Sequence, residues 1–386
     1  MSRILFVVPP LTGHVNPTVA VGTELGARGH DVAWAGHPDT LRPLLPVGAR
    51  VFPVISDARD AYLREGRERW MKLRGAAALK FFWEDFIIPL AHATLPGVAA
   101  AIASFAPRVV IADQQAPAGA VAARRAGIAW VTSATTPAEL LRPLAGLPKV
   151  EDWISDQMTV FQLANGIGDP VDLRFSDQLV LVFTTSALLG DTSGFAKNFV
   201  FTGPALASRP DRGSFPWSWL DPERRHLLVS LGTINGLAGM RFFRVAVEAL
   251  AGLGPELQAV IAAPPAGRVP SHILFAGHVP QLALLPHMAA VVSHGGHNTV
   301  CESLAHGLPL VVTPIRDDQP LIAQQVADAG AGIRLRFGRL RTEALRDAVR
   351  AVLDDPAYHT AAGRIRDSFA AAGGAVTAAD HLEKLL

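Results

Sequence analysis

The sequence predicts an α/β protein made of two doubly wound parallel sheets, and three observations point to this fold class. Short apolar runs alternate with amphipathic helical stretches, the pattern of buried parallel strands joined by crossover helices. The alternation stops near residue 204 and starts again near residue 223. At 386 residues the chain is also long for one hydrophobic core. We therefore expect a first domain over residues 1–204, a Pro-rich linker over 205–222 and a second domain over 223–374.

The composition excludes several classes of protein. The chain is 49% hydrophobic and 18% charged, which is typical of a globular protein. Its formal net charge is +1 and it has no run of basic residues, so a nucleic-acid partner is not expected. The single Cys301 excludes an intrachain disulfide framework and a cysteine-based metal cluster. The chain start lacks a signal-peptide pattern, and no apolar run approaches the ~20 residues that span a bilayer. A cytoplasmic protein without membrane anchoring is expected.

The first half opens with a strand–loop–helix–strand unit. Residues 4–9 are the expected first strand, and Asn16 followed by Pro17 is typical of a helix N-cap and first helical position. The helix is expected to end at Gly29, before a strand over residues 31–35. Ligands of such sheets bind at the carboxyl ends of the strands. His14, in the loop expected after the first strand, therefore lies where chemistry usually occurs. A later strand, over residues 109–112, ends at Asp113.

Two stretches of the first half, residues 60–90 and 139–175, depart from the α/β alternation. They are rich in large aromatic residues, for which a place in the core of an added helical layer is the simpler interpretation. As a group they could instead line an apolar pocket for a small molecule. The candidates for such an acceptor-binding surface are Trp70, Phe82, Trp83, Phe86 and Phe161.

From residue 226 the alternation restarts, with strands expected over 227–231, 258–262 and 273–276. The central feature of this half is residues 289–306. An apolar strand leads into the polar glycine turn 294–299 and then a helix, expected to begin near Val300. Free backbone N–H groups and the helix dipole make such a turn suitable for an anion such as a pyrophosphate. Amphipathic helices, the last over residues 375–386, complete the chain.

Several common motifs are missing. The sequence contains no G-x-G-x-x-G after the first strand, no G-x-x-x-x-G-K-[ST] and no G-x-S-x-G. The spacing of His294, His297 and Glu302 matches no usual zinc pattern, so we expect no metal site.

The combination resembles the family 1 nucleotide-sugar-dependent glycosyltransferases, in particular the bacterial macrolide and antibiotic enzymes. The second half carries the signature box of that family: Pro280-Gln281, His294-x-Gly296-x-Asn298-Thr299, Glu302, Gly307-x-Pro309 and Asp318-Gln319. In the first half, Gly13-His14-Val15-Asn16-Pro17 is similar to the catalytic loop of the family. The resemblance covers the whole chain. It implies the GT-B fold, with two facing Rossmann-like domains, a deep cleft between them, and the helix 375–386 packed back on the first, acceptor-binding domain.

The reaction implied by this resemblance is inverting transfer of a sugar from a nucleoside diphosphate to an acceptor nucleophile. An alcohol needs a base to take its proton, and His14 fits this role. Its place before a helix N-terminus favours the neutral imidazole. Asp113, at the end of a neighbouring strand, would fix the tautomer of that imidazole.

The resemblance also implies a role for each residue of the donor site. His294, Gly295, Gly296, Asn298 and Thr299 would bind the phosphates with help from Thr233, although Asn298 or Thr299 could equally be a helix cap. Glu302 would accept both ribose hydroxyls, which favours UDP over dTDP. Val279 and Gln281 would hold the base, and Asp318 and Gln319 the hydroxyls of a hexose such as glucose. The nucleotide sugar, with UDP-glucose as the leading candidate, is then a cosubstrate, and no cofactor is expected.

The leading hypothesis is a glycosyltransferase acting on a hydrophobic natural product such as a polyketide, macrolide or aromatic aglycone, as a monomer or homodimer. A nucleotide-sugar epimerase and a catalytically silent sugar-nucleotide-binding partner are the alternatives.

Overall fold

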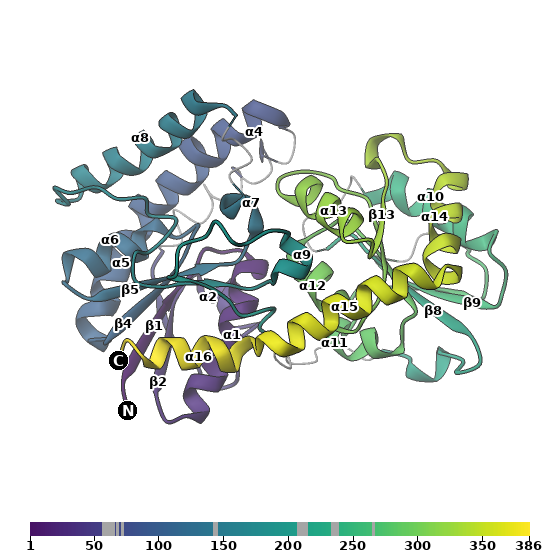
Figure 1. Cartoon of the computed structure of the whole chain (residues 1–386), viewed down its shortest axis with the longest axis horizontal. Coiled ribbons are helices and arrows are strands. Elements are labelled where there is room, and N and C mark those ends of the chain that lie inside the picture. The colour runs from purple at the N-terminus through teal and green to yellow at the C-terminus, as the bar shows by residue number, and fades with distance from the viewer. Residues whose placement is uncertain are drawn as a thin grey trace. The chain divides into compact units, whose positions relative to one another are not determined.

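The computed structural model describes the chain except for residues 56–65, 67–68, 71–72, 142–145, 207–214, 233–238 and 265–266, and the side chain of Ala138. The chain divides into two compact units, which are described separately here (Figure 1). Unit 1 comprises Met1–Phe183, Gly194–Pro210 and Gly373–Leu386. Unit 2 comprises Thr184–Ser193 and Asp211–Ala372.

Unit 1 is built on a seven-stranded sheet within its described residues, in the order β3-β2-β1-β4-β5-β6-β7. Every pair of neighbouring strands is parallel. The order reverses between β1 and β4, so this is the point at which ligands of open α/β sheets bind. The strands are β1 (Arg3–Val7), β2 (Asp31–Gly36), β3 (Arg50–Pro53), β4 (Val109–Asp113), β5 (Ala129–Ala134), β6 (Val180–Val182) and β7 (Phe199–Phe201).

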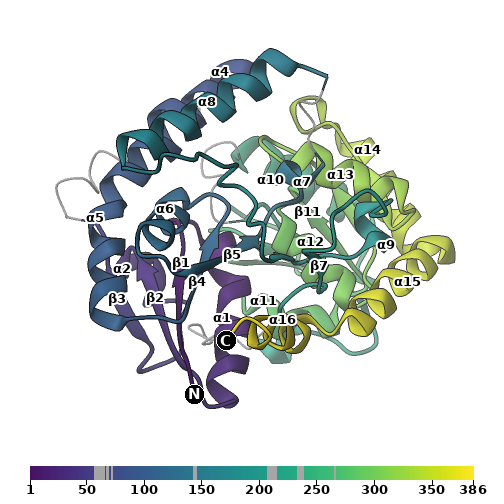
Figure 2. The same cartoon turned by 60° about the vertical axis from the view of Figure 1, so that its left-hand side comes forward.

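Helices cover both faces of this sheet (Figure 2). Successive side chains of a strand point to opposite faces. Ile4 and Phe6 therefore pack with α1 and α16, while Leu5 and Val7 pack with α5, α6 and α8. The helices of unit 1 are α1 (Thr12–Ala27), α2 (Pro38–Leu41), α4 (Gly75–Phe81), the π-helix η1 (Phe82–Ile87), α5 (Ile88–Phe105), α6 (Pro117–Arg125), α7 (Pro137–Leu140), α8 (Pro148–Ala164) and α16 (Gly374–Glu383).

Helix α1 begins earlier than the sequence indicates. We expected a start at Asn16 and Pro17, but the helix starts at Thr12, and Pro17 lies inside it. The N–H groups of His14 and Val15 both donate to the carbonyl of Leu11, which closes the first turn. Because the first four N–H groups of a helix have no intrahelical acceptor, a proline this close to the start removes little hydrogen bonding. His14 therefore lies in the first helical turn and not in a loop.

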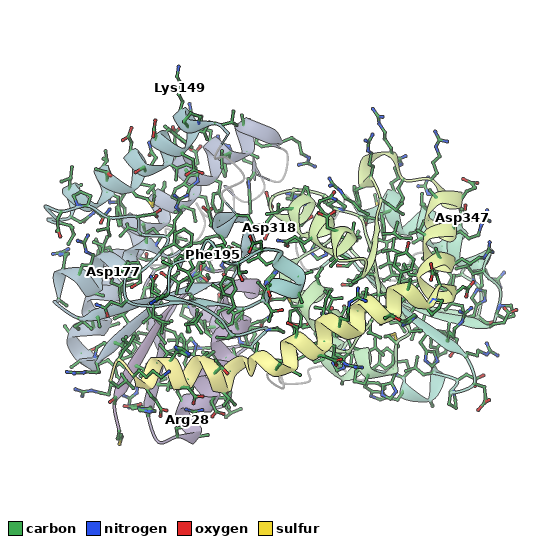
Figure 3. All side chains as sticks on the ribbon, in the orientation of Figure 1. Arg28, Lys149, Asp177, Phe195, Asp318 and Asp347 are labelled. Atoms are coloured by element: carbon green, nitrogen blue, oxygen red, sulfur yellow. The ribbon has the colours of Figure 1, made fainter. Side chains whose placement is uncertain are left out.

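The C-terminal helix α16 packs against α1 through buried Ala378, Ala379 and Leu382. At the edge of this contact, Arg28 donates to Asp380 at 2.7 Å and to Glu383 at 2.8 Å (Figure 3). The hydrogen bonds from His30 and Arg28 lower the pKa of the Glu383 carboxyl. Apolar burial thus orients α16, and an ion-pair cluster borders it.

Unit 2 holds a six-stranded parallel sheet in its described part, in the order β10-β9-β8-β11-β12-β13, reversing between β8 and β11. Its strands are β8 (Arg225–Ser230), β9 (Leu257–Ala262), β10 (Ile273–Ala276), β11 (Ala290–Ser293), β12 (Leu310–Val312) and β13 (Gly332–Arg334). Its helices are α9 (Ser186–Leu189), η2 (Trp217–Trp219), α10 (Gly239–Ala251), α11 (Gln281–Leu284), η3 (Leu285–His287), α12 (His297–Ala305), α13 (Gln319–Asp328), η4 (Phe337–Arg339), α14 (Thr342–Asp354) and α15 (Pro356–Ala372). The prediction of two parallel-sheet α/β domains is confirmed.

The helical stretch Gly75–Phe105 is the one candidate span that passes a test of length and apolar composition for crossing a membrane, among the residues described. Half of its most apolar window is buried inside the protein. Its inner side chains, among them Leu90, Leu95 and Val98, belong to the core on the α5 face of the sheet. Part of this stretch therefore belongs to the core of unit 1.

Candidate active site

The two predicted catalytic residues lie together at the switch point of unit 1. His14 is in the first turn of α1, which follows β1, and Asp113 is the last residue of β4, the parallel neighbour of β1. The Nδ1 atom of His14 is 2.9 Å from Oδ1 of Asp113. The histidine side chain is 14% exposed and the carboxylate is fully buried. The backbone N–H of Gln115 also donates to Oδ1 of Asp113 at 2.8 Å.

A third residue, Thr135, joins this pair and was missed by the sequence analysis. It directly follows β5, the next parallel strand. Its Oγ1 lies 2.7 Å from Nδ1 of His14 and 2.7 Å from Oδ2 of Asp113. The sequence did contain a signal for Thr135. It is a hydroxyl residue just after a strand, and neighbouring parallel strands bring such residues to the same edge of the sheet as Asp113.

In unit 2, the side chain of His294 follows β11 and is packed between two glycines. A Cβ atom on Gly232 would lie 2.7 Å from Cε1 of His294, and one on Gly296 would lie 2.6 Å from Nε2. Burial lowers the pKa of His294 to about 4, although the charge of Asp318 acts in the opposite direction. The imidazole is therefore neutral near pH 7. Its shielded Nδ1 has no hydrogen-bond partner in the described structure.

Helix α12 begins three residues after His294, at His297, with Gly296 as N-cap. We expected the helix to begin near Val300, so Asn298 and Thr299 are in its first turn and not in the preceding turn. Because Gly296 is the N-cap, neither Asn298 nor Thr299 is the cap. The first N–H groups of a helix have no intrahelical acceptor, which is the arrangement expected of an anion site. Gly295 reaches this geometry with a φ of +88°.

The residues expected to hold the ribose and base are linked to each other. Gln281, at the start of α11, donates its Nε2–H to Oε2 of Glu302 at 2.6 Å. Glu302 is 1% exposed, on the first turns of α12. Val279 packs on the edge of the core beside α12. Gln281 therefore positions the carboxylate predicted to bind the ribose.

The loop expected to hold the sugar is stabilised by its own glutamine. Oε1 of Gln319 accepts the N–H groups of Ile315 at 2.9 Å and Arg316 at 3.1 Å, and Gln319 is buried. Asp317, which lies between Arg316 and Gln319 in the chain, has a φ of +55°, in the left-handed region that favours glycine. Asp318 then forms the N-cap of α13. The side-chain carbonyl of Gln319 thus holds the backbone of the loop that contains Asp318. The Thr233 prediction lies outside the described residues.

The aromatic residues predicted to face an acceptor are mostly in the core. Trp70, Trp83, Phe86 and Phe161 are buried in the cluster on the α5 face of the sheet, and Phe161 is 0% exposed. The rings of Trp70 and Phe86 stack at 6.1 Å, and Phe161 meets the ring of His92 edge-on at 4.8 Å. Phe82 is half-buried against the same cluster. These residues stabilise the helical layer from inside, because burying their large apolar surfaces lowers the free energy of the folded state. Buried side chains leave little surface for contact with a ligand.

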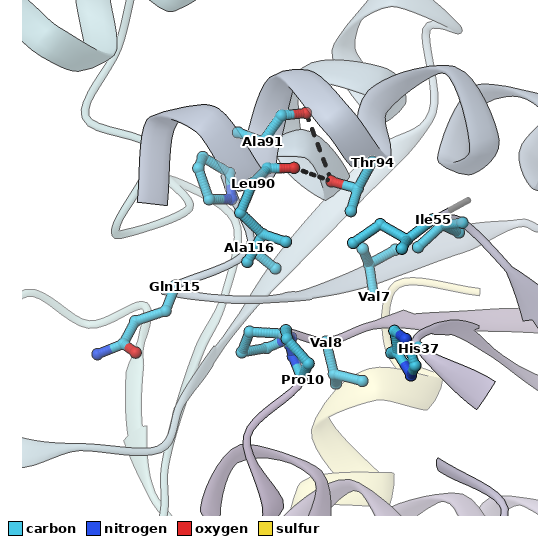
Figure 4. A pocket seen from close by; sticks show the side chains of 13 residues that line it. Val7, Val8, Pro10, His37, Ile55, Leu90, Ala91, Thr94, Gln115 and Ala116 are labelled. Carbon is cyan, nitrogen blue, oxygen red and sulfur yellow. Dashed lines mark hydrogen bonds between the residues drawn. The ribbon is translucent and has the colours of Figure 1, made fainter. Parts of the chain in front are cut away.

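A small pocket lies beside this core, at the carboxyl ends of β1, β2 and β3 (Figure 4). Its walls are mainly apolar, with His37, Thr94 and Gln115 as the polar members. The hydroxyl of Thr94 donates to the carbonyl of Leu90 at 2.8 Å, so it faces back to its own helix. One lining residue of this pocket, Gln115, is two positions after Asp113 in the chain. No group of three or more potential metal-ligating side chains occurs among the residues that the structure describes.

Comparison with known proteins agrees with this geometry. Residues 254–385 match the family described as the C-terminal domain of erythromycin biosynthesis protein CIII-like proteins. The chain is 28% identical to 4'-demethylrebeccamycin synthase of Lentzea aerocolonigenes, with 100% of both chains covered. It is 29% identical to demethyllactenocin mycarosyltransferase of Streptomyces fradiae, covering 100% of this chain and 87% of the relative. The solved glycotransferase of kitacinnamycin superposes with a TM-score of 0.81 at 28% identity, covering 100% of this chain and 99% of that one.

Along its whole length the chain is similar to glycosyltransferases of antibiotic biosynthesis, and its two parallel-sheet domains have the GT-B fold. The resemblance found in the sequence is thereby confirmed. The chain carries its His14–Asp113 pair in unit 1, and the residues of the signature box in unit 2.

Proposed function

We propose that this protein moves a hexose, with inversion, from a nucleoside diphosphate sugar to a hydroxyl or similar nucleophile of an apolar natural product. The observation that supports the proposal most directly is the contact between His14 and the buried carboxylate of Asp113. In the reaction, Nε2 of the neutral imidazole takes the acceptor proton while the acceptor oxygen attacks the anomeric carbon. The bond from that carbon to the diphosphate breaks, and its electron pair leaves with the nucleotide. Asp113 stabilises the imidazolium that forms.

The leaving diphosphate carries negative charge that unit 2 is built to receive. We propose that it binds at the N-terminus of α12, where backbone N–H groups and the helix dipole favour an anion. His294, neutral beside this turn, would donate one hydrogen bond without adding a charge. We expect no metal ion or other cofactor to be required.

We propose UDP-glucose as the leading donor, ahead of dTDP-sugars. Glu302 supports this choice, because a carboxylate that accepts two ribose hydroxyls requires the 2′-hydroxyl that deoxythymidine lacks. Comparison of kcat/KM for UDP-glucose and dTDP-glucose tests it, with the exposed Glu343→Gln as a control for Glu302→Gln. A preference for dTDP-glucose in the wild-type protein would refute the assignment.

For the acceptor we propose that the apolar pocket beside Gln115 receives part of the aglycone. Its mainly apolar lining suits an apolar group, and one lining residue, Gln115, is two positions after Asp113 in the chain. The test is a mass-spectrometric screen of polyketide, macrolide and aromatic aglycones with both donors. Conversion of the nucleotide sugar without any acceptor would instead indicate epimerase activity, and nucleotide binding without transfer or hydrolysis would indicate a silent binding partner.

A further inference from the structure

Thr135 makes two short hydrogen-bond contacts, one with His14, the proposed general base, and one with Asp113. The number of protons that these side chains carry determines which atom donates in each contact. Asp113 is a buried carboxylate that can only accept. The Thr135 hydroxyl has one proton, and its Oγ1 lies 2.7 Å from both His14 Nδ1 and Asp113 Oδ2. If that proton pointed at His14, two lone pairs would face each other between Thr135 and Asp113. The same would hold between His14 and Asp113, at 2.9 Å.

One arrangement satisfies all three contacts. The Thr135 hydroxyl donates to Oδ2 of Asp113, and the imidazole carries its proton on Nδ1. That N–H is shared between Oδ1 of Asp113 and Oγ1 of Thr135. Nε2 is then the unprotonated nitrogen, the one that a general base needs.

We propose that Thr135 is a positioning residue that fixes the tautomer and the ring orientation of His14. A contact with Asp113 alone leaves the imidazole free to tilt about one hydrogen bond. The second acceptor comes from the end of another strand, and it holds the ring plane between the ends of β4 and β5. The kinetic part of this inference rests on the proposed function, whereas the tautomer part does not.

The geometry also argues against a direct contact between the Thr135 proton and substrate. Thr135 is 4% exposed, and its single proton is already donated to Asp113. Loss of the hydroxyl should therefore change the state of His14 and leave the binding of the sugar donor unchanged.

The test compares Thr135→Val, which keeps the shape and removes the hydroxyl, with Thr135→Ser, which keeps the hydroxyl. Thr132→Val is the matched control. Thr132 lies within β5, about 10 Å before Thr135 along the chain, and its replacement also removes a buried hydroxyl contact, the one that accepts from the N–H of Ser176. Nitrogen NMR of the His14 ring reports the tautomer without any substrate. If Thr135→Val does not fold, Thr135→Ala replaces it.

We expect the Nδ1–H tautomer in the wild-type, Thr135→Ser and Thr132→Val proteins, and a mixture of tautomers in Thr135→Val. We also expect kcat of Thr135→Val to fall roughly 10-fold, the lower end for loss of a partner that orients a functional histidine, with donor KM unchanged.

An unchanged tautomer in Thr135→Val would overturn the proposal, as would a change confined to donor KM, which would indicate a substrate contact. If the wild-type protein transferred no sugar at all, the proposed function would fail while the NMR result still decided the role of Thr135.

Discussion

The sheets of the two units reverse their strand order at equivalent places, between β1 and β4 in unit 1 and between β8 and β11 in unit 2. A histidine follows a central strand at each place. His14 contacts a buried carboxylate and a threonine hydroxyl. His294 is packed between glycines, and burial lowers its pKa to about 4. The same position in the fold therefore carries a histidine paired with a carboxylate in one unit and a buried, neutral histidine in the other, and the neighbouring side chains make the difference.

The largest effect should follow from removing the base. We expect His14→Ala to lower kcat about 1,000-fold, within the usual range for general base catalysis, with little change in donor KM. His359→Ala, on α15 of unit 2, serves as the control in the same steady-state assay. Unchanged turnover in His14→Ala would mean that another group accepts the proton.

Replacing the carboxylate should have the next largest effect. Asp113→Asn removes the negative charge that would stabilise the imidazolium form of His14. We expect kcat to fall by roughly 100-fold or more at pH 7. Asp177→Asn, at an exposed position of unit 1, should retain full activity. An active Asp113→Asn protein would show that His14 does not depend on this partner.

Crowding His294 tests the other half of the comparison. In Gly296→Ala the new methyl group would meet the imidazole at 2.6 Å, so the ring must move. We expect donor KM to rise about 10-fold, equivalent to loss of one good hydrogen bond, while kcat changes less. Gly363→Ala, whose methyl group would meet nothing within 4 Å, is the matched control. Equal donor KM in the two variants would remove His294 from the donor site.

The smallest effect concerns stability and pH. The pKa of His294 is lowered to about 4 in the folded protein, so the unfolded chain binds more protons between pH 6.5 and 4. The stability due to the neutral ring is thus fully present above pH 6.5 and is lost as the pH falls toward 4, by up to about 3 kcal/mol. His294→Gln, which cannot titrate, should lose less stability than the wild-type protein between pH 7 and pH 4.5 in denaturant unfolding. Parallel losses in the two proteins would contradict the lowered pKa.

The sequence predicted both sheets and the pairing of His14 with Asp113, because apolar runs report burial and strand ends converge at one edge. It could not show Thr135, since its role depends on the register of β4 against β5. It left Trp83 and Phe161 open between the core and a binding surface, because composition does not reveal which face of a helix is buried. The signature box indicated that Gln319 is important. Only the structure shows that its side-chain carbonyl accepts hydrogen bonds from the backbone of its own loop.

The path of the chain between the units has a consequence for engineering. Unit 2 includes Thr184–Ser193, where Thr185 meets Ser368 at 2.8 Å, and unit 1 includes α16. A chimera made by a single crossover near residue 210 would therefore combine an α16 from one parent with an α1 from the other. The apolar face of Ala378 and Leu382, and the cluster around Arg28, would have to match a foreign surface. Exchange of donor specificity between such enzymes should succeed more often when residues 184–193 and 211–372 are transplanted together and the recipient keeps its own C-terminal helix.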